Sequence, residues 1–366
     1  GSAITMNLPA GSAGAIVAVS DYARNFETYN LTISPNGSEK IGGTAGDAIL
    51  NVNGQAATFV YVDSTKGWIN VQNAEDTEAA QTFISATGGT VATVCTDFKI
   101  HTFTGPGTFC VSAGSGPVAV AEYIVVAGGG GGGSPSGGGG GAGGFRFASP
   151  TLAPATYPGK PLAAPAALPV TVQGYPITIG AGGPGSDGTS SSTAGQGTPG
   201  NPSTFSTITS TAGGGGASPC ATPFNTVGGP GGSGGGGGDP GGPGVGGAGN
   251  TPPVTPPQGN PGGTKQAGGG GALGAGTGNP GTPSPSVSPS GVGAGIPTAF
   301  GSNGTPCGSF RYYASGGAGR FTSAPTVPTN QGGGGTGGNS GSSNNGTANT
   351  GGGGGGDGSS GAAGVG

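Results

Sequence analysis

The sequence predicts an all-β protein in which N-terminal β modules precede a glycine-rich bundle of polyproline II and polyglycine II helices, with irregular loops and essentially no α-helix. Two observations lead to this prediction. Residues 1–126 contain β-branched and aromatic runs separated by turn residues, and the whole chain contains 95 glycines in 366 residues. Charged residues make up only 6% of the chain, so charge repulsion is too weak to keep it disordered.

Residues 1–72 form the first predicted module, because strand-forming runs alternate there with turn residues. The expected strands are residues 15–20, 31–34, 48–52, 58–62 and 68–71. Asn36-Gly37 and Asn53-Gly54 suit type I′ turns, which need positive φ at both central residues. The second dipeptide predicts a hairpin over residues 48–62, and a turn over residues 63–67 leads into Trp68.

A connector and a second β unit are predicted over residues 73–126. Residues 73–82 are acidic and alanine-rich, which leaves room for a short helical segment. Residues 98–103 alternate in polarity and predict a strand, and Gly105-Pro106-Gly107 predicts a turn. Residues 108–111 and 118–126 predict two more strands before the composition changes abruptly.

Residues 127–366 form the predicted glycine-rich domain, in which glycine runs alternate with loops rich in proline, serine and threonine. The runs are residues 128–133, 137–144, 213–216, 228–238, 241–249, 268–276, 332–338 and 351–356. Strand-like pieces interrupt them at residues 175–180 and 203–211. A glycine at every third position never persists for long, which argues against a collagen triple helix.

The number of glycine runs favours a packed bundle. A single run would be typical of a flexible linker, but the chain has eight of similar length. A polyproline II helix has three residues per turn and no internal hydrogen bonds, so its N–H and C=O groups need partners on neighbouring chains. Glycine alone permits the close approach of the backbones, and we therefore expect the runs to bond to one another.

Several function classes find no support in the residue pattern. The basic residues form no stripe that suits a phosphate backbone, which argues against nucleic-acid binding. The glycine runs match a dinucleotide-binding spacing, but the strand and helix which that motif requires are not predicted around them. His101 is the only histidine, and the sequence offers neither a catalytic partner nor zinc ligands at suitable spacing. The sequence predicts no enzymatic activity, no metal and no cofactor.

Four cysteines, Cys95, Cys110, Cys220 and Cys307, allow three pairings. Their positions favour Cys95 with Cys110 and Cys220 with Cys307. Buried free thiols are the alternative, but the polar, glycine-rich surroundings favour disulfides and an extracellular environment.

Aromatic residues next to the few basic residues are the candidates for contact with a receptor. These aromatic residues and their basic neighbours are Phe145, Arg146, Phe147, Tyr157, Phe310, Arg311, Tyr312, Tyr313 and Arg320. Exposed aromatic and arginine side chains on a rigid scaffold are typical of recognition surfaces. The alternative is that the rings close the bundle as small cores. The loops over residues 148–174 and 296–323 hold most of these residues and are the expected contact loops.

Several stretches resemble tail-fibre proteins of marine bacterial viruses, cyanophages in particular. Leu8-Pro9-Ala10, Asp21-Tyr22-Ala23, Asn30-Leu31-Thr32-Ile33, Asn36-Gly37 and Gly67-Trp68 resemble β modules of these fibres. Residues 98–103, 107–109 and 122–127, which run into polyglycine, resemble the junction to the glycine-rich domain that ends such fibres, and residues 176–183 and 200–205 also resemble that domain. Together these stretches cover most of the chain.

The resemblance implies a virion tail fibre that contacts other tail or fibre proteins, usually as a homotrimer, with a distal glycine-rich tip. In similar phage adhesins, polyglycine II helices pack together and variable loops bind the host; a surface polysaccharide or an outer-membrane protein would suit arginine beside tyrosine. The few large apolar residues of residues 1–126 also favour a trimer that shares strands between subunits. Cys110 stands where similar domains have a threonine or valine, which suggests a local disulfide. The chain stops at Gly364-Val365-Gly366, whereas similar domains continue into a short strand, which suggests a truncated chain.

Two other interpretations remain open. Some ice-binding proteins pack glycine-rich polyproline II helices, although they need a flat, regular face and the loops here are long. The chain could also be a secreted, self-assembling extracellular filament. The position of the chain in purified particles would distinguish these interpretations.

Overall fold

The computed structural model describes residues 2–74, 83–94, 98–114, 118–150, 152, 154–188, 196–219, 226–239, 244–278, 288–320, 332–339, 343–358 and 362–366. In these residues the protein is all-β, with many small sheets and two short 3₁₀ turns, η1 (Lys160–Leu162) and η2 (Thr298–Phe300). The predicted fold class is confirmed. The described part of the chain contains no helix with the length and apolar character needed to cross a membrane.

The chain divides into two compact units, Gly1–Thr82 and Phe83–Gly366. Residues 83–126, predicted as part of a separate β unit, belong to the second unit. The reason is that β10 (Gly107–Ala113) pairs with β15 (Gly174–Thr178), which lies in the glycine-rich part of the sequence. The predicted connector lies outside the described residues from residue 75 onward, and its first two residues complete a strand.

Two small sheets enclose the core in the described residues of the first unit. One sheet has the order β1 (Ile4–Asn7), β3 (Leu31–Ser34), β4 (Ala48–Leu50), and the other has the order β2 (Ile16–Ser20), β5 (Ala56–Asp63), β6 (Gly67–Ala74). Trp68, Phe59 and Ile33 are fully buried between them. Every second residue of β5 from Ala57 to Tyr61 is buried, as expected for a strand with one face toward the core.

The predicted hairpin over residues 48–62 is wrong, although its turn is present. Gly54 has a φ of 77°, and the Gln55 N–H donates to the Val52 carbonyl at 3.1 Å. However, β4 pairs with β3, whereas β5 pairs with β2 and β6. Alternation and a turn dipeptide cannot distinguish a hairpin from a crossing between sheets. The predicted turn over residues 63–67 does join β5 to β6 as a hairpin.

One carboxylate organises the loop that follows β2. The Asp21 Oδ2 atom accepts hydrogen bonds from the Phe26 N–H at 2.9 Å and the Gly54 N–H at 3.1 Å. Burial by itself raises the pKa of Asp21, but the N–H groups of Phe26, Gly54, Asn25 and Arg24 together outweigh it and hold the pKa below its usual value.

We expect Asp21→Asn to weaken the acid dependence of the first unit's stability. Because folding lowers this pKa, the charged carboxylate stabilises the fold fully above about pH 4, the unfolded value, and the effect is lost as the pH falls through the folded pKa. The fluorescence of Trp68, the only tryptophan, measures unfolding of this unit. The same change at the exposed Asp47 is the control and should leave the acid dependence in place. Parallel acid-unfolding curves for wild type and Asp21→Asn would contradict the assignment.

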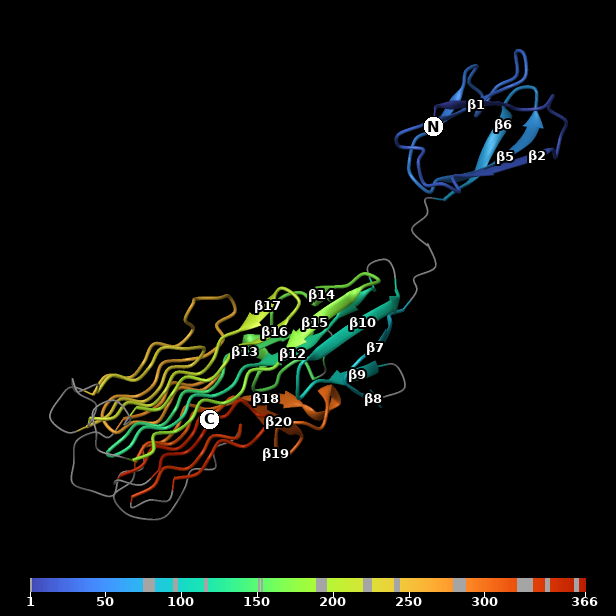
Figure 1. Cartoon of the computed structure of the whole chain (residues 1–366). Helices are drawn as coiled ribbons and strands as arrows, with labels where there is room; N and C mark the ends of the chain where they lie inside the picture. The colour runs from blue at the N-terminus through green and yellow to red at the C-terminus, as the bar shows by residue number, and fades with distance from the viewer. Residues whose placement is uncertain are drawn as a thin grey trace. The chain divides into compact units, whose positions relative to one another are not determined.

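The strands of the second unit lie at one end of a bundle of extended runs (Figure 1). A five-stranded sheet has the order β17 (Ile208–Ser210), β16 (Ser203–Phe205), β15, β10, β7 (Ser85–Thr87). Three two-stranded sheets pair β8 (Thr90–Val94) with β9 (Phe98–Thr102), β11 (Val120–Ala121) with β14 (Leu168–Pro169), and β12 (Tyr123–Val126) with β13 (Phe145–Ala148). In a three-stranded sheet, β20 (Phe310–Tyr313) lies between β18 (Ala294–Pro297) and β19 (Thr305–Cys307). The predicted strands at residues 98–103, 108–111 and 175–180 are present. The piece at residues 203–211 is a hairpin, and β13, β14 and β18–β20 were not predicted.

The glycine runs form a polyglycine II lattice. In run 128–133, the N–H groups of residues 128 and 131 donate to run 198–201, and those of residues 130 and 133 donate to run 138–141, at 2.9 to 3.0 Å. The partner therefore repeats every three residues, which is the period of a polyproline II helix. No glycine of this run has a positive φ, so the run has the single hand of that helix.

Each central run is surrounded on all sides. Run 128–133 also donates to Gly364, and it accepts hydrogen bonds from residues 183–186, 213–216 and 354–357, which gives six neighbours among the described residues. Run 137–144 is also enclosed: its hydrogen-bonding neighbours in the described chain are residues 127–133, 211–217, 233–236, 267–270, 317 and 351–357. Six neighbours around one helix is hexagonal packing. The backbone polar groups are satisfied by these lateral hydrogen bonds.

Close packing explains why these positions are glycine. A Cβ at Gly130 would lie 2.2 Å from the Gly214 carbonyl oxygen, and one at Gly139 would lie 2.1 Å from that of Gly317. Side chains occur where a run faces outward: Ala181, Pro184 and Asp187 are exposed at intervals of three residues. Segments that contain proline and serine therefore join the lattice as its outer layer, although their composition predicted loops.

Candidate functional site

Most of the predicted contact aromatics form a core where the bundle meets the sheets. Phe145 and Phe147 of β13 are each 1% exposed. The Phe147 ring lies 6.2 Å from Tyr157, and the Phe145 ring lies 6.3 Å from Tyr313 of β20, measured between ring centroids. Tyr312 is buried as well. Burial removes these five side chains from the reach of a receptor. The alternative that the sequence left open, a core that closes the bundle, describes Phe145, Phe147, Tyr157 and Tyr313.

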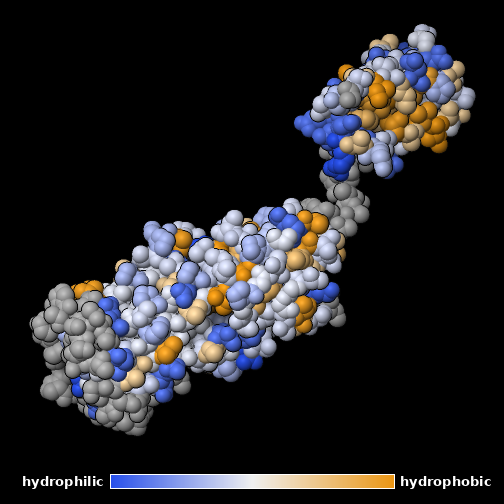
Figure 2. All heavy atoms as spheres, in the orientation of Figure 1, coloured by the Kyte–Doolittle hydropathy of each residue, from blue (hydrophilic) through white to orange (hydrophobic). Residues whose placement is uncertain are grey.

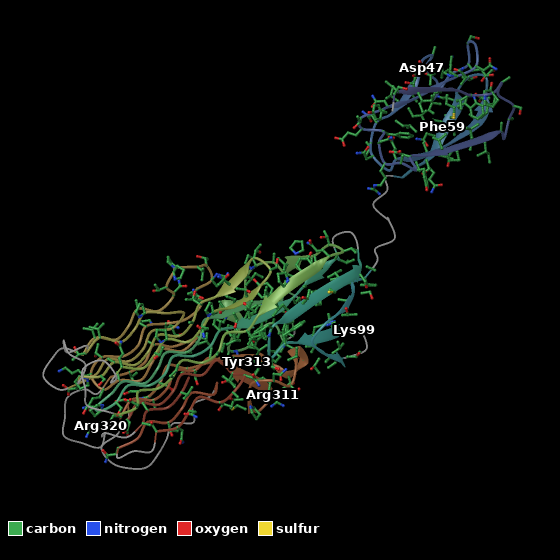
Figure 3. All side chains as sticks on the ribbon, viewed as in Figure 1. Asp47, Phe59, Lys99, Arg311, Tyr313 and Arg320 are labelled. Carbon is green, nitrogen blue, oxygen red and sulfur yellow. The ribbon has the colours of Figure 1, made fainter. Side chains whose placement is uncertain are left out.

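The remaining candidates, Arg146, Phe310, Arg311 and Arg320, are half-buried and do not form one patch. Figure 3 shows Arg311 and Tyr313 near the sheets and Arg320 at the opposite end of the bundle. The predicted contact loop over residues 296–323 is therefore not a single loop. It contains the last two residues of β18, then η2, β19 and β20, and then a run over residues 314–319 that bonds within the lattice.

The second predicted contact loop, residues 148–174, covers the sheet end of the bundle. It contributes η1 and β14, and its described residues include the buried Leu162 and Val170. The Lys160 Nζ atom lies 5.5 Å from the centre of the Tyr157 ring, close enough for a cation–π contact. These contacts give the loop a packing role.

The buried tyrosines are neutral packing groups, and of Tyr313 and Tyr157 only Tyr313 has a hydrogen-bond partner for its hydroxyl among the described residues. Burial raises the pKa of Tyr313 to about 12, with a smaller opposing effect of the Arg311 charge, and its hydroxyl donates to the Asn303 carbonyl at 2.7 Å. Burial, and then the charge of Glu122, raises the pKa of Tyr157. These hydroxyl groups therefore stay protonated near neutral pH. The described residues hold no cluster of three or more His, Cys, Asp or Glu side chains arranged for a metal ion.

His101 lies on a strand face, as predicted. Its Nδ1 atom is 2.8 Å from the Gly88 carbonyl oxygen, and its ring packs edge-on against Phe109 at 5.1 Å. These contacts assign the ring to the packing of the sheets.

Charged residues from separate runs lie at the end of the bundle opposite the sheets, called here the far end and defined by Ser136, Asp239, Lys265, Arg320 and the buried Asp357. The Arg320 Nη1 atom donates to the Ser136 Oγ atom at 3.0 Å, and the Asp239 N–H donates to the Ser136 carbonyl at 3.3 Å. The Gly137 N–H donates to the Asp357 carbonyl, and the Lys265 N–H donates to the Gly244 carbonyl. This grouping could not be predicted from the sequence, because these residues are far apart in the chain and only the lattice brings them together.

A family model for a glycine-rich domain matches residues 102–366. The chain belongs to this glycine-rich domain family. The matched range begins in the last residue of β9 and includes the strands from β10 onward and the lattice, which agrees with their packing as one unit. A search among curated proteins found no match to the chain.

Two of the four predicted disulfide cysteines are described, and both belong to the glycine-rich domain. Cys110 is exposed on β10, and Cys307 is half-buried on β19. Cys95 and Cys220 lie outside the described residues. Each predicted pair has one member outside the described residues, so the pairing of Cys95 with Cys110 and of Cys220 with Cys307 stays a prediction.

Proposed function

We propose that this chain is a structural fibre protein of a bacterial virus, located in the tail fibre, whose glycine-rich domain attaches to the host surface. The observation that supports the proposal most strongly is that the domain consists of a lattice whose backbone N–H and C=O groups bond to one another and a far end that carries charged residues. A lattice whose N–H and C=O groups bond to one another offers few groups for recognition. Specificity then depends on side chains that project from its ends.

The sheet end and the far end differ in what they offer a receptor. At the sheet end, the predicted contact rings are buried in a core. At the far end, Lys265 is exposed, and its backbone is fixed by the bond to Gly244. We therefore assign host attachment to the far end, which includes Arg320, and not to residues 148–174 or to residues 296–313 at the sheet end. An anionic surface polysaccharide or an acidic loop of an outer-membrane protein would suit an exposed lysine there.

The purified full-length chain should compete with the virus for adsorption to host cells. We expect Lys265→Glu to weaken this competition about tenfold, because the loss of a contact residue typically costs 1 to 2 kcal/mol or more. The measurement is the concentration of chain that halves adsorption. Antibody labelling of purified particles, imaged by electron microscopy, locates the chain.

The matched control is Lys99→Glu, because Lys99 is an exposed lysine on β9 at the sheet end (Figure 3). It should compete as wild type does. Equal competition by both variants would move the contact away from the far end. Particles without label would contradict the tail-fibre assignment itself and would favour a secreted filament.

A further inference from the structure

One face of the first unit is apolar, uncharged and open. The outward-pointing side chains of the sheet β2-β5-β6 are Ile16, Ala18, Ser20, Ala56, Thr58, Val60, Val62, Ile69 and Gln72, here called the outer face. Ile16 is 67% exposed and Val62 is 43% exposed. In Figure 2, hydrophobic surface gathers over this sheet. Exposed apolar patches of this kind mark interaction sites on soluble proteins.

The outer face has a bulky half and a small half. Strand pairing aligns Ile16 with Val60, and Val60 with Ile69, in one row. The next rows align Ala18 with Thr58, and Ser20 with Ala56. The small side chains leave a hollow of about 300 Å³, lined in part by Ala18, Ser20, Ala56 and Thr58. The face therefore carries a ridge and a hollow side by side.

The charges of the unit limit which partner can cover this face. Residues 1–74 contain five acidic and three basic residues, and none of them is on the outer face. Two copies of the unit repel each other wherever their net negative surfaces meet, and like charges brought together cost several kcal/mol. The uncharged outer face is where two copies can meet without that cost.

We propose that copies of this chain associate through the outer face, with the bulky half of one copy packed into the hollow of the next. Such a face is self-complementary: the Ile16 row of the first copy fills the Ala18 row of the second. In a two-fold pair, each copy provides both halves to the other. In a closed ring, each copy provides them to different neighbours. The inference concerns the first unit and does not rest on the proposed attachment role.

The test is the mass of the full-length chain in solution, measured by sedimentation at micromolar concentrations. Wild type should form a discrete oligomer, and either Ile16→Lys or Ala18→Glu should weaken association about tenfold or more, because each buries an unpaired charge. Ile49→Glu is the control: Ile49 is equally apolar and exposed, but lies on β4 of the other sheet. This variant should associate as wild type does. Trp68 fluorescence verifies that each variant is folded, since this ring is fully buried.

Mixing supplies a second, independent measurement. If Ile16 of one copy faces Ala18 of another, an equimolar mixture of Ile16→Lys and Ala18→Glu should associate where neither variant does alone, because lysine then meets glutamate. Recovery in the mixture supports the pairing of ridge and hollow. A wild-type chain that stays monomeric overturns the proposal, and so does an oligomer that neither variant weakens. Folded variants that fail to recover on mixing overturn the proposed ridge-to-hollow contact.

Discussion

Gly235→Val and Gly270→Val should each destabilise the glycine-rich domain by about 3 kcal/mol or more. A Cβ at Gly235 would lie 2.0 Å from the Gly215 carbonyl oxygen, and one at Gly270 would lie 2.0 Å from that of Asn260. Both obstacles are backbone atoms that take part in lattice hydrogen bonds, so neither can rotate away as a side chain would. Thermal or denaturant unfolding of the full-length chain, followed by calorimetry, measures the effect.

Gly105→Val is the matched control for this experiment. Gly105 belongs to the same unit, but a Cβ built there meets no atom within 4 Å. The expected change is within about 0.5 kcal/mol. If Gly235→Val and Gly270→Val unfold at the same temperature or denaturant concentration as wild type and Gly105→Val, the runs cannot be packed at the distances described above. The fully buried Ala142 and Ala217 show that the lattice accepts a methyl group where space exists, so the predicted loss is specific to position.

Phe147→Ala should cost the glycine-rich domain about 3 to 5 kcal/mol. Its ring is fully enclosed and packs against both Tyr157 and Phe300, at 6.2 and 5.6 Å between centroids. Truncation leaves a cavity where η1, η2 and β13 meet the bundle. Unfolding of the full-length chain in denaturant, with the slope compared to wild type, measures the loss.

Phe98→Ala is the corresponding control, because Phe98 is 57% exposed on β9. It should change the unfolding free energy by less than about 1 kcal/mol. This pair also separates the two roles that the sequence allowed for the aromatics. A Phe147→Ala chain that keeps wild-type stability but no longer competes for adsorption would restore the contact role and contradict the core assignment.

Much of the fold could be predicted because glycine content and strand patterns reflect local chemistry. The runs at residues 128–133 and 137–144 contain too many glycines for a linker interpretation, and the lattice confirms them. Pro184 and Pro199 were assigned to loops, because sequence alone does not show which positions face outward. An outward N–H needs no partner within the lattice, so proline is accepted there. The missed strands β18–β20 are short and depend on contacts with the aromatic core.

The site could be predicted less well than the fold. Phe145-Arg146-Phe147 places aromatic and basic residues together, which is typical of a recognition loop and equally of a strand with alternate residues buried. The distinction depends on β12, which pairs with this segment across the turn between the first two glycine runs. The far-end group could not be found from sequence, since Ser136 and Arg320 are 184 residues apart.

The three-residue period of the lattice restricts how such a chain can change length. One residue added inside run 128–133 would rotate the following residues by about 120°, so each N–H would face a different neighbour. Three added residues would restore every partner. The turns between runs carry no such restriction, since an insertion there shifts nothing in the lattice. We therefore expect length differences among natural variants to come in multiples of three within runs and in any number at the turns. The turns at the ends of the bundle can then vary in length, while each N–H in the interior keeps the same hydrogen-bond partner.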